Sequence, residues 1–271
     1  MRKLSGRVAA VTGAAGGIGR ATAVALARRG MDLALADVRR AELDETAEAV
    51  RALGRRASVH EVDVAVRERV TAFADEVVDA HGIVHLLVNN AGVAVAGTFE
   101  DQSIEDFEWL MNINFWGVVH GCKAFLPHLR RASEGHIVNL SSLFGLIGVP
   151  GNASYGASKF AVRGLSKVLR AELASSRIGV TSVHPGGVAT NIVRDARFVG
   201  ETKALHERTE RAFRKFLPPE RVAEAIVRGV RRNSPRVLVG RETFVLDALE
   251  RLAPSVAERL LSRAWSRIRV R

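Results

Sequence analysis

The sequence has few of the features that would place it in several large classes of protein. It contains one cysteine, Cys122, which excludes a fold held together by disulfide bonds. No stretch reaches the roughly 18 consecutive apolar residues that a membrane-spanning helix needs. The basic start, residues 1–3, runs into a glycine-rich turn rather than the apolar core of a signal peptide. Low-complexity segments are missing and 47% of the residues are hydrophobic, which excludes a disordered chain. We expect a globular, cytoplasmic protein.

Acidic residues are scarce in the last part of the chain. The 271 residues carry a net charge of +11, of which residues 194–271 contribute +9, from 19 basic and 10 acidic side chains. Arginine outnumbers lysine 34 to 6, which coding bias alone could produce. The charge therefore fits either solubility or a surface-binding role. Nothing resembles a nucleic-acid recognition module, and we expect no nucleic-acid partner.

Short apolar runs alternate with helical periodicity along the whole chain. The runs predict buried strands at 7–12, 33–36, 58–62, 86–88, 136–140, 179–183 and 236–239. Helical segments lie between them, at about 17–29, 40–53, 66–80, 103–130, 153–175 and 219–232. This alternation predicts an α/β fold: a doubly wound parallel sheet of about seven strands in a three-layer α/β/α sandwich. We expect one domain at 1–240 with a basic, amphipathic helical C-terminal extension at 241–271.

A glycine-rich turn, Thr12–Gly19, joins the first expected strand to the first expected helix. Glycines there let the backbone approach a pyrophosphate, whose charge the helix N-terminus stabilises. Asp37 ends the second strand, where a carboxylate can hold both ribose hydroxyls of an adenosine. It would repel a 2′-phosphate, which favours NAD, although Arg39 and Arg40 could offset this and allow NADP. Asp63, at the end of the third strand, fits either a contact with the adenine amino group or a cap at the start of a loop.

Tyr155 is the only tyrosine in the chain, and Lys159 follows it by four residues on the same face of the expected helix. A free tyrosine has a pKa of about 10. We expect the lysine ammonium to lower the pKa of Tyr155, so that the phenol can act as an acid/base near neutral pH. Ser142 ends the fifth strand 13 residues earlier, so its hydroxyl can donate a hydrogen bond to the same substrate oxygen. Ser141 should point to the opposite face.

In order and spacing, these motifs resemble the short-chain dehydrogenase/reductase family. The resemblance covers about residues 5–240 and rests on Thr12-Gly13-x-x-x-Gly17-x-Gly19, Asn89-Asn90-Ala91-Gly92, Asn114, Ser142, Tyr155-x-x-x-Lys159 and Pro185-Gly186. It implies a Rossmann fold and hydride transfer between nicotinamide C4 and a carbonyl or secondary alcohol. By this resemblance Tyr155 is the acid/base and Ser142 positions the substrate oxygen. Lys159 binds the nicotinamide ribose, and Asn114 holds a water in the proton relay.

The resemblance also assigns residues to the cofactor. Asn90 and Gly92 would shape the floor of its site, and residues 183–188 with Thr190 would contact the carboxamide side of the nicotinamide. The full expected set is Gly13, Ala15, Gly16, Gly17, Ile18, Gly19, Asp37, Val38, Arg39, Asp63, Val64, Asn90, Ala91, Gly92, Tyr155, Lys159, Pro185, Gly186, Val188 and Thr190. Because position 16 is also glycine, the turn equally satisfies the T-G-x-x-G-x-x-G pattern of longer, epimerase-type relatives. The chain lacks the length of their larger substrate domain.

Histidine and cysteine provide no further site. The eight histidines form no metal-binding pattern, since Gly82 separates His81 from His85, and we expect no metal. His184, which precedes Pro185, fits packing better than chemistry. Cys122 fits a small core residue.

The sequence therefore predicts an NAD-preferring oxidoreductase that acts on a secondary alcohol or ketone. Apolar segments at 93–99 and 143–149 flank the expected site and suit a lipophilic substrate, unless they only pack against neighbouring helices. A lid is expected at about 187–217, and its basic side chains leave an anionic substrate open: Arg194, Arg197, Lys203 and Arg208. The alternatives are an NADP-dependent carbonyl reductase of the same fold and a catalytically silent, nucleotide-binding scaffold at membranes.

Two partner surfaces are also expected. The resemblance suggests a homodimer or homotetramer in which the helices at 103–130 and 153–175 pack across subunits. Residues 255–271 combine apolar residues at helical spacing with five arginines and no acid after Glu258. This basic, amphipathic segment fits packing onto the body or a partner subunit, or a peripheral contact with an anionic membrane surface.

Overall fold

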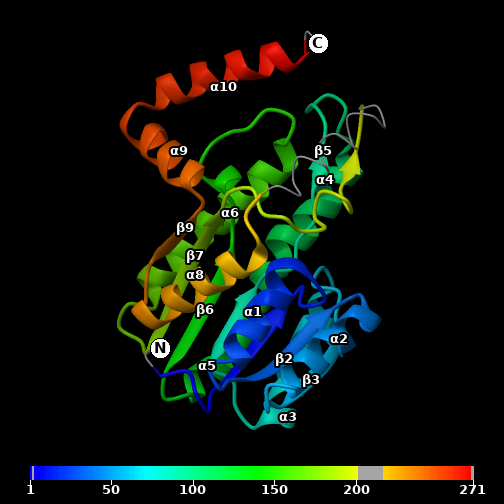
Figure 1. The fold of residues 1–271 in the computed structure, drawn as a ribbon, viewed down its shortest axis with the longest axis vertical. Coiled ribbons are helices and arrows are strands. Elements are labelled where there is room, and N and C mark those ends of the chain that lie inside the picture. Colours follow the sequence, from blue (N-terminus) through cyan, green and yellow to red (C-terminus); the bar gives the residue numbers. More distant parts are fainter. Residues whose placement is uncertain (2, 201–215, 270–271) are drawn as a thin grey trace.

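A computed structural model of the protein describes residues 1, 3–200 and 216–269, with side chains described up to Arg263 (Figure 1). Its centre is a seven-stranded sheet in which all neighbouring strands are parallel. In spatial order the strands are β3 (Ala57–Glu61), β2 (Asp32–Asp37), β1 (Val8–Thr12), β4 (Leu86–Asn89), β6 (Gly135–Leu140), β7 (Ile178–Pro185) and β9 (Arg236–Val239). The order reverses between β1 and β4, and ligands of such sheets bind at the carboxyl ends of the strands beside this reversal. The predicted doubly wound sheet is confirmed.

Helices cover both faces of the sheet and give the three layers. One face carries α1 (Gly17–Ala27), α2 (Arg40–Arg51) and α8 (Pro219–Arg232), and the other α3 (Arg67–His81), α5 (Gly117–Arg131) and α6 (Ala153–Glu172). Strand β1 supplies both cores because successive side chains point to opposite faces. Ala9 and Val11 join the core beneath α1 and α8. Val8 and Ala10 join the core beneath α3 and α5. A strand buried on both faces must be apolar throughout, as β1 is.

The segment 103–130, expected as one long helix, is helical throughout but contains a π-helical turn. α4 (Ile104–Met111) passes into a π-helical turn at Asn112–Trp116 before α5 begins. Such turns insert a residue into a helix and occur frequently at functional sites. Here the turn contains Asn114, which is fully buried. The predicted long helix is therefore present over residues 104–131, but the π-helical turn within it was not predicted, because the helical periodicity of the sequence carries no mark of the inserted residue.

Two short strands outside the main sheet are also absent from the sequence-based expectation. β5 (Val95–Ala96) pairs in parallel with β8 (Arg197–Phe198). Arg197 forms a salt bridge with Asp106 of α4 at 2.8 Å and lies over the ring of Trp109. These contacts hold the segment after β7 beside the start of α4. Of the expected lid, residues 201–215, including Lys203 and Arg208, lie outside the described residues.

The C-terminal extension consists of α9 (Arg241–Leu252) and α10 (Pro254–Arg269). The edge strand β9 anchors α9 through a two-pronged salt bridge, in which Arg236 donates to both carboxylate oxygens of Asp247 at 2.7 Å. α10 extends away from the body at the far end of α9 (Figure 1), and Leu261 packs against the apolar residues that follow β6. Within the described ranges, no helix has the length and apolar character needed to cross a membrane.

Candidate active site

The glycine-rich turn follows β1, where the strand order reverses. Gly13 and Gly17 have φ angles of +65° and +52°, a region that favours glycine. Gly19 is required for another reason, since a Cβ there would overlap the carbonyl group of Gly13. Gly16 differs: its backbone is extended, with φ −165°, and an added Cβ would meet only Arg39, at 3.5 Å. The fold thus requires glycine at 13, 17 and 19, which is the T-G-x-x-x-G-x-G pattern and not the alternative through position 16.

Asp37 ties this turn to the end of β2. Its Oδ2 accepts a hydrogen bond from the Ala15 N–H at 3.0 Å, and its Oδ1 accepts from the Arg39 N–H at 3.1 Å. The carboxylate is only 8% exposed, whereas the neighbouring Val38 is exposed. The Arg39 guanidinium lies between two carboxylates, 3.4 Å from Asp37 and 3.7 Å from Asp195. A buried carboxylate therefore stands beside the turn, with a cation on its outer side.

The start of α1 follows the carboxyl end of β1, where sheets of this kind form the crevice that holds their ligands. Gly16 is the N-cap of α1 and provides no side chain to cap the helix, and Ile18 packs against the core below. The first backbone N–H groups of a helix have no partner within the helix, and they bind anions readily. An uncapped N-terminus next to a buried carboxylate offers one place for phosphates and another for hydroxyl groups.

The Asn-Asn-Ala-Gly motif closes the crevice from the end of β4. Asn90 Nδ2 donates to the carbonyl groups of Thr12 and Gly13, at 2.9 and 3.1 Å. The Thr12 hydroxyl in turn accepts from the N–H groups of Asn90 and Ala91, at 3.0 and 3.1 Å. The motif therefore fixes the glycine turn against the neighbouring strand.

Asp63 and Val64 lie in the loop after β3, beside Asp37. Asp63 Oδ1 accepts from the Ala65 N–H at 2.9 Å, so the side chain caps the start of the loop. Val64 is buried against Gly117 of α5. The structure thus shows the capping role of Asp63, and a contact with adenine stays a prediction.

The segment after β7 returns to the glycine turn. Pro185 ends the strand, and Gly186 is packed against the start of α9. Val188 is buried. Thr190 lies against Gly17, where an added Cβ would come within 3.1 Å of its methyl group. Thr190 is thus the residue of this segment that contacts the turn.

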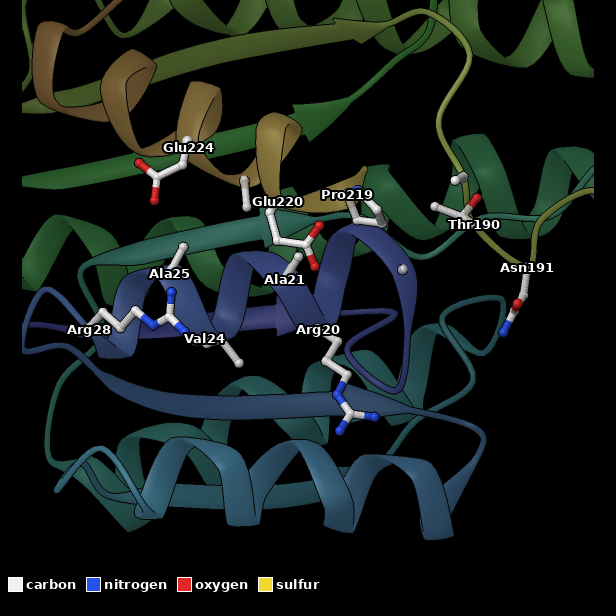
Figure 2. A pocket seen from close by; sticks show the side chains of 13 residues that line it. Arg20, Ala21, Val24, Ala25, Arg28, Thr190, Asn191, Pro219, Glu220 and Glu224 are labelled. Carbon is white, nitrogen blue, oxygen red and sulfur yellow. The ribbon is translucent and has the colours of Figure 1, made fainter. Parts of the chain in front are cut away.

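A cavity of about 320 Å³ opens between α1 and α8 (Figure 2). Thr190 lies at one end of it and Arg28 and Glu224 at the other, and Gly17 is also part of its lining. The candidate catalytic side chains line no part of it. It is therefore a groove beside the glycine turn, separate from the candidate catalytic side chains.

The structure brings Ser142, Tyr155 and Lys159 together. Ser142 follows β6 and begins a 3₁₀ turn, in which its Oγ accepts from the Phe144 N–H at 3.1 Å. The Ser142 side chain lies close enough to Tyr155 to lower the pKa of its phenol. Tyr155 and Lys159 lie one turn apart on α6, with Lys159 Nζ 5.5 Å from the centroid of the tyrosine ring. Two hydroxyls and an ammonium group therefore share one site, as proton transfer at a substrate oxygen requires.

The electrostatics of this site differ from the expectation. Burial raises the pKa of Tyr155, and the nearby Ser142 side chain lowers it. The expected lowering by Lys159 is not seen, because its ammonium faces the ring and donates to the Leu140 carbonyl at 3.2 Å. Burial also lowers the pKa of Lys159 itself, to about 8. In this structure burial is the largest influence on the pKa of both groups.

Asn114 is held by three hydrogen bonds in the π-helical turn. Its Oδ1 accepts from the Val93 N–H at 2.8 Å, and its Nδ2 donates to the Val93 carbonyl at 2.9 Å and to Ser158 Oγ at 3.3 Å. Gly92 brings it near the catalytic helix, since a Cβ there would lie 3.1 Å from Asn114 Oδ1 and 3.4 Å from Lys159 Nζ. Both polar ends of Asn114 are engaged by the protein, and its role in holding a water stays a prediction.

Two serines support the site in ways that the sequence analysis missed. Ser158 Oγ donates to the Tyr155 carbonyl at 2.7 Å and accepts from Asn114. Ser141 Oγ donates to the Lys159 carbonyl at 2.8 Å and so ties the end of β6 to α6. The signal for Ser158 is its spacing, because a residue three positions after Tyr155 shares its helix face. No comparable signal marks the contact of Ser141.

The histidines and the cysteine considered in the sequence analysis take no part in the candidate catalytic site. Among the residues whose placement is described, no group of three or more His, Cys, Asp or Glu side chains could hold a metal ion. His81 interacts with Ser58, and His85 accepts from the Val8 N–H, so the two rings serve different contacts. Cys122 is buried, and burial raises its pKa to about 12. It is a core residue, as predicted.

Comparisons with known proteins agree with this geometry. The short chain dehydrogenase family profile matches residues 7–198. SadH of Mycobacterium tuberculosis, named as an oxidoreductase, is 43% identical over 265 residues, which span 97% of this chain and 96% of SadH. EphD of Mycobacterium bovis, also named as an oxidoreductase, is 37% identical over 269 residues, 96% of this chain but 44% of EphD. A short-chain dehydrogenase/reductase from Burkholderia phymatum, crystallised in complex with NAD, has a TM-score of 0.89 and 31% identity, covering 94% of this chain and 96% of that one.

The chain therefore belongs to the short-chain dehydrogenase/reductase family, which confirms the resemblance found in its motifs. Its seven-stranded parallel sheet is the Rossmann fold of that family. The protein is an NAD(P)-dependent oxidoreductase of the kind that acts on CH–OH groups.

Proposed function

We propose that this protein is an NAD-preferring oxidoreductase that transfers a hydride between the nicotinamide and a secondary alcohol or ketone, with Tyr155 as the acid/base. The observation that supports the proposal best is the meeting of Ser142 and Tyr155 with Lys159 at one site beside the glycine turn. Oxidation of a secondary alcohol removes a proton from oxygen and a hydride from carbon. The site offers a protein group for the first, and the cofactor of this family accepts the second.

The residues of the crevice fit a nicotinamide dinucleotide. The uncapped N-terminus of α1 suits a pyrophosphate, and the buried carboxylate of Asp37 suits the ribose hydroxyls of the adenosine. Gly92 has no side chain, so the space beside Asn114 and Lys159 stays open. When bound there, the dinucleotide supplies the hydride acceptor for alcohol oxidation or the hydride donor for ketone reduction.

The protein's own residues handle the proton. Tyr155 takes the proton of the substrate hydroxyl during oxidation and returns it during reduction. Ser142 donates a hydrogen bond to the substrate oxygen and stabilises the negative charge that develops there. Ser142 Oγ accepts the Phe144 N–H, and this bond leaves the hydroxyl hydrogen available to donate to a substrate oxygen. Lys159 holds the nicotinamide ribose, and Asn114 positions a water behind it.

The preference for NAD follows from the charges around Asp37. Its carboxylate accepts hydroxyl hydrogens but repels a 2′-phosphate. Arg39 is the group that could reverse this preference, and it is shared between Asp37 and Asp195. We expect a higher kcat/KM with NAD than with NADP, and a further loss of activity with NADP in Arg39→Ala. A higher kcat/KM with NADP would favour the carbonyl reductase alternative.

We propose a lipophilic substrate, but fewer of the apolar side chains expected to line its pocket support this than the sequence suggested. Leu143, Leu146 and Ile147 are buried against the C-terminal helices, so these side chains pack rather than line a pocket. Phe144 packs against the same cluster, but its ring also lies edge-on to Tyr155, with centroids 5.9 Å apart. An apolar ring beside the reacting hydroxyl favours a ketone or alcohol with an apolar substituent.

The variant Tyr155→Phe tests the mechanism, because it removes the hydroxyl and keeps the ring. We expect NADH binding, followed by fluorescence, to persist while turnover falls by orders of magnitude across a panel of secondary alcohols and ketones. The panel is read by NADH absorbance and run in parallel with NADPH. Undiminished turnover would remove Tyr155 from the mechanism. A wild-type protein that binds cofactor but turns over nothing would support the silent scaffold instead.

Two surfaces support the proposed partners. Trp116 and Phe160 are exposed on the helices expected to pack across subunits, which fits a homodimer or homotetramer. Leu252, Val256 and Leu260 are exposed on α9 and α10, which fits a peripheral contact with an anionic membrane or a partner subunit. Light scattering tests the first. Flotation with phosphatidylserine vesicles tests the second, where membrane contact predicts binding that high salt and removal of residues 255–271 abolish.

A further inference from the structure

His184 lies on β7 beside the end of β6, and both of its ring nitrogens are engaged. The two strands stay paired up to this point, because the Ser141 N–H donates to the Val183 carbonyl at 2.9 Å. One residue further on, His184 Nδ1 lies 3.1 Å from the carbonyl oxygen of Ser142. On the other side of the ring, Nε2 lies 2.6 Å from Ser182 Oγ. The residue is 1% exposed, so water has little access to replace either contact.

These contacts define which nitrogen carries the proton. A carbonyl oxygen can only accept, so Nδ1 carries the hydrogen and donates it to Ser142. Nε2 of the neutral ring then accepts from the Ser182 hydroxyl. Burial lowers the pKa of His184 to about 4, which keeps the ring neutral at physiological pH. A directed chain of hydrogen bonds therefore runs from Ser182 through His184 to the backbone of Ser142.

We propose that His184 is a positioning residue for the reaction: its Nδ1–H fixes the carbonyl group of Ser142 and thereby the direction of the Ser142 hydroxyl. The proposal rests on the role of Ser142 given above. The carbonyl and the side chain branch from the same Cα, so fixing one limits where the other can point.

Among the described residues, this carbonyl accepts one other hydrogen bond, and that bond does not fix the turn to the sheet. The Gly145 N–H donates to it at 3.0 Å, within the 3₁₀ turn that Ser142 begins. That bond holds the turn together but leaves it able to move as a unit. The bond from His184 ties the turn to β7, an interior strand of the sheet.

Three substitutions separate positioning from packing. Asparagine places an amide N–H near the position of Nδ1, glutamine places its amide near Nε2, and leucine has no polar atom. With 2-octanol and NAD, or the fastest secondary alcohol of the panel, we expect His184→Asn to retain kcat within about twofold. His184→Gln and His184→Leu should each lose about tenfold in kcat, the range of one buried hydrogen bond. The Kd for NADH should stay unchanged in all three.

A double-mutant cycle shows whether the effect passes through the hydroxyl. In a Ser142→Ala background there is no hydroxyl to direct, so His184→Leu should lower kcat no further. His136→Leu is the matched control. His136 is also a buried histidine on an interior strand, with Nε2 2.8 Å from the Thr181 hydroxyl, but it lies at the opposite end of β6. Its loss should lower Tm and leave kcat unchanged.

Nitrogen-15 NMR of the histidine rings adds a readout that needs no turnover, because the Nδ1–H tautomer has its own chemical shifts. We expect one such signal to disappear in His184→Leu. Equal kcat values in the Asn, Gln and Leu variants, an undiminished effect of His184→Leu in Ser142→Ala, or an Nε2–H tautomer would each overturn the positioning role while leaving the oxidoreductase intact. A wild-type protein that shows the tautomer and binds NADH but oxidises no alcohol would overturn the proposed function, and the role of His184 with it.

Discussion

The glycine turn offers a matched pair of substitutions whose outcomes should differ sharply. A Cβ at Gly19 would overlap the backbone carbonyl of Gly13 and lie 2.6 Å from Asn90 Nδ2. Neither neighbour can move freely, because Asn90 is itself bonded to the carbonyls of Thr12 and Gly13. A Cβ at Gly16 would meet only the end of the Arg39 side chain, at 3.5 Å. We therefore expect Gly19→Ala to be destabilising and Gly16→Ala to be nearly neutral.

The expected change in the free energy of unfolding is the difference between a steric cost and a gain in helix propensity. Overpacking a rigid site costs about 3 kcal/mol, at the upper end of the usual range. Alanine in place of glycine inside a helix returns about 1 kcal/mol, so Gly19→Ala should lose about 2 kcal/mol. That corresponds to a fall in Tm of roughly 4 to 8 °C for a chain of this size. At Gly16 the loss of a favourable N-cap residue and the reduced entropy of the unfolded chain nearly cancel, leaving a change within about 0.5 kcal/mol.

Urea denaturation followed by circular dichroism, with thermal melting as a second measurement, checks this prediction. Equal stability of the two variants, or a Gly19→Ala protein as stable as the wild type, would refute the argument. It would mean that the turn can relax around a side chain at position 19 and that the glycine pattern is not dictated by packing.

Further predictions concern other parts of the molecule. Burial lowers the pKa of His136 to about 3 and of His184 to about 4. As the pH falls, these histidines are therefore protonated in the unfolded chain before they are protonated in the folded protein. The free energy of unfolding should therefore fall as pH drops from about 6.5 to about 4, less steeply in His184→Asn, as urea titrations at each pH will show. Cys122 should react with a thiol reagent at pH 8 only after unfolding, because burial raises its pKa to about 12. Asp247→Ala should lower the stability by about 2 kcal/mol, since it leaves the guanidinium of Arg236 without its carboxylate, and a melting curve will measure the loss.

The parts of the fold that could be predicted are those in which a residue's surroundings are decided by local pattern. β1 has to be apolar throughout because helices cover both faces of the sheet, and its sequence shows this directly. β9 also has the predicted bounds of 236–239, although it lies at the edge of the sheet and only Val239 is buried. The spacing of Tyr155 and Lys159 could be interpreted as one helix face because helix geometry alone determines it.

What could not be predicted depends on contacts between distant segments. The π-helical turn is stabilised where Asn114 binds the backbone of Val93, and no helical periodicity records that bond. The pKa of Tyr155 is raised by its burial in the folded protein, whereas the sequence shows only the neighbouring lysine. The role of Ser158 was missed because it depends on two partners, one on its own helix and one on another.

His184 shows how the sheet itself determines the chemistry. The residue is separated from Ser142 by 42 positions, and the two meet because β6 and β7 pair in register from Gly135–Ile178 to Leu140–Val183. A slip of one residue in this pairing would turn the face of β7 that carries Ser182 and His184 away from its present neighbours. The ring would then lose the Ser142 carbonyl even though every residue of the family motif remained in place. The direction of the Ser142 hydroxyl is therefore a property of strand register as much as of the motif that contains it.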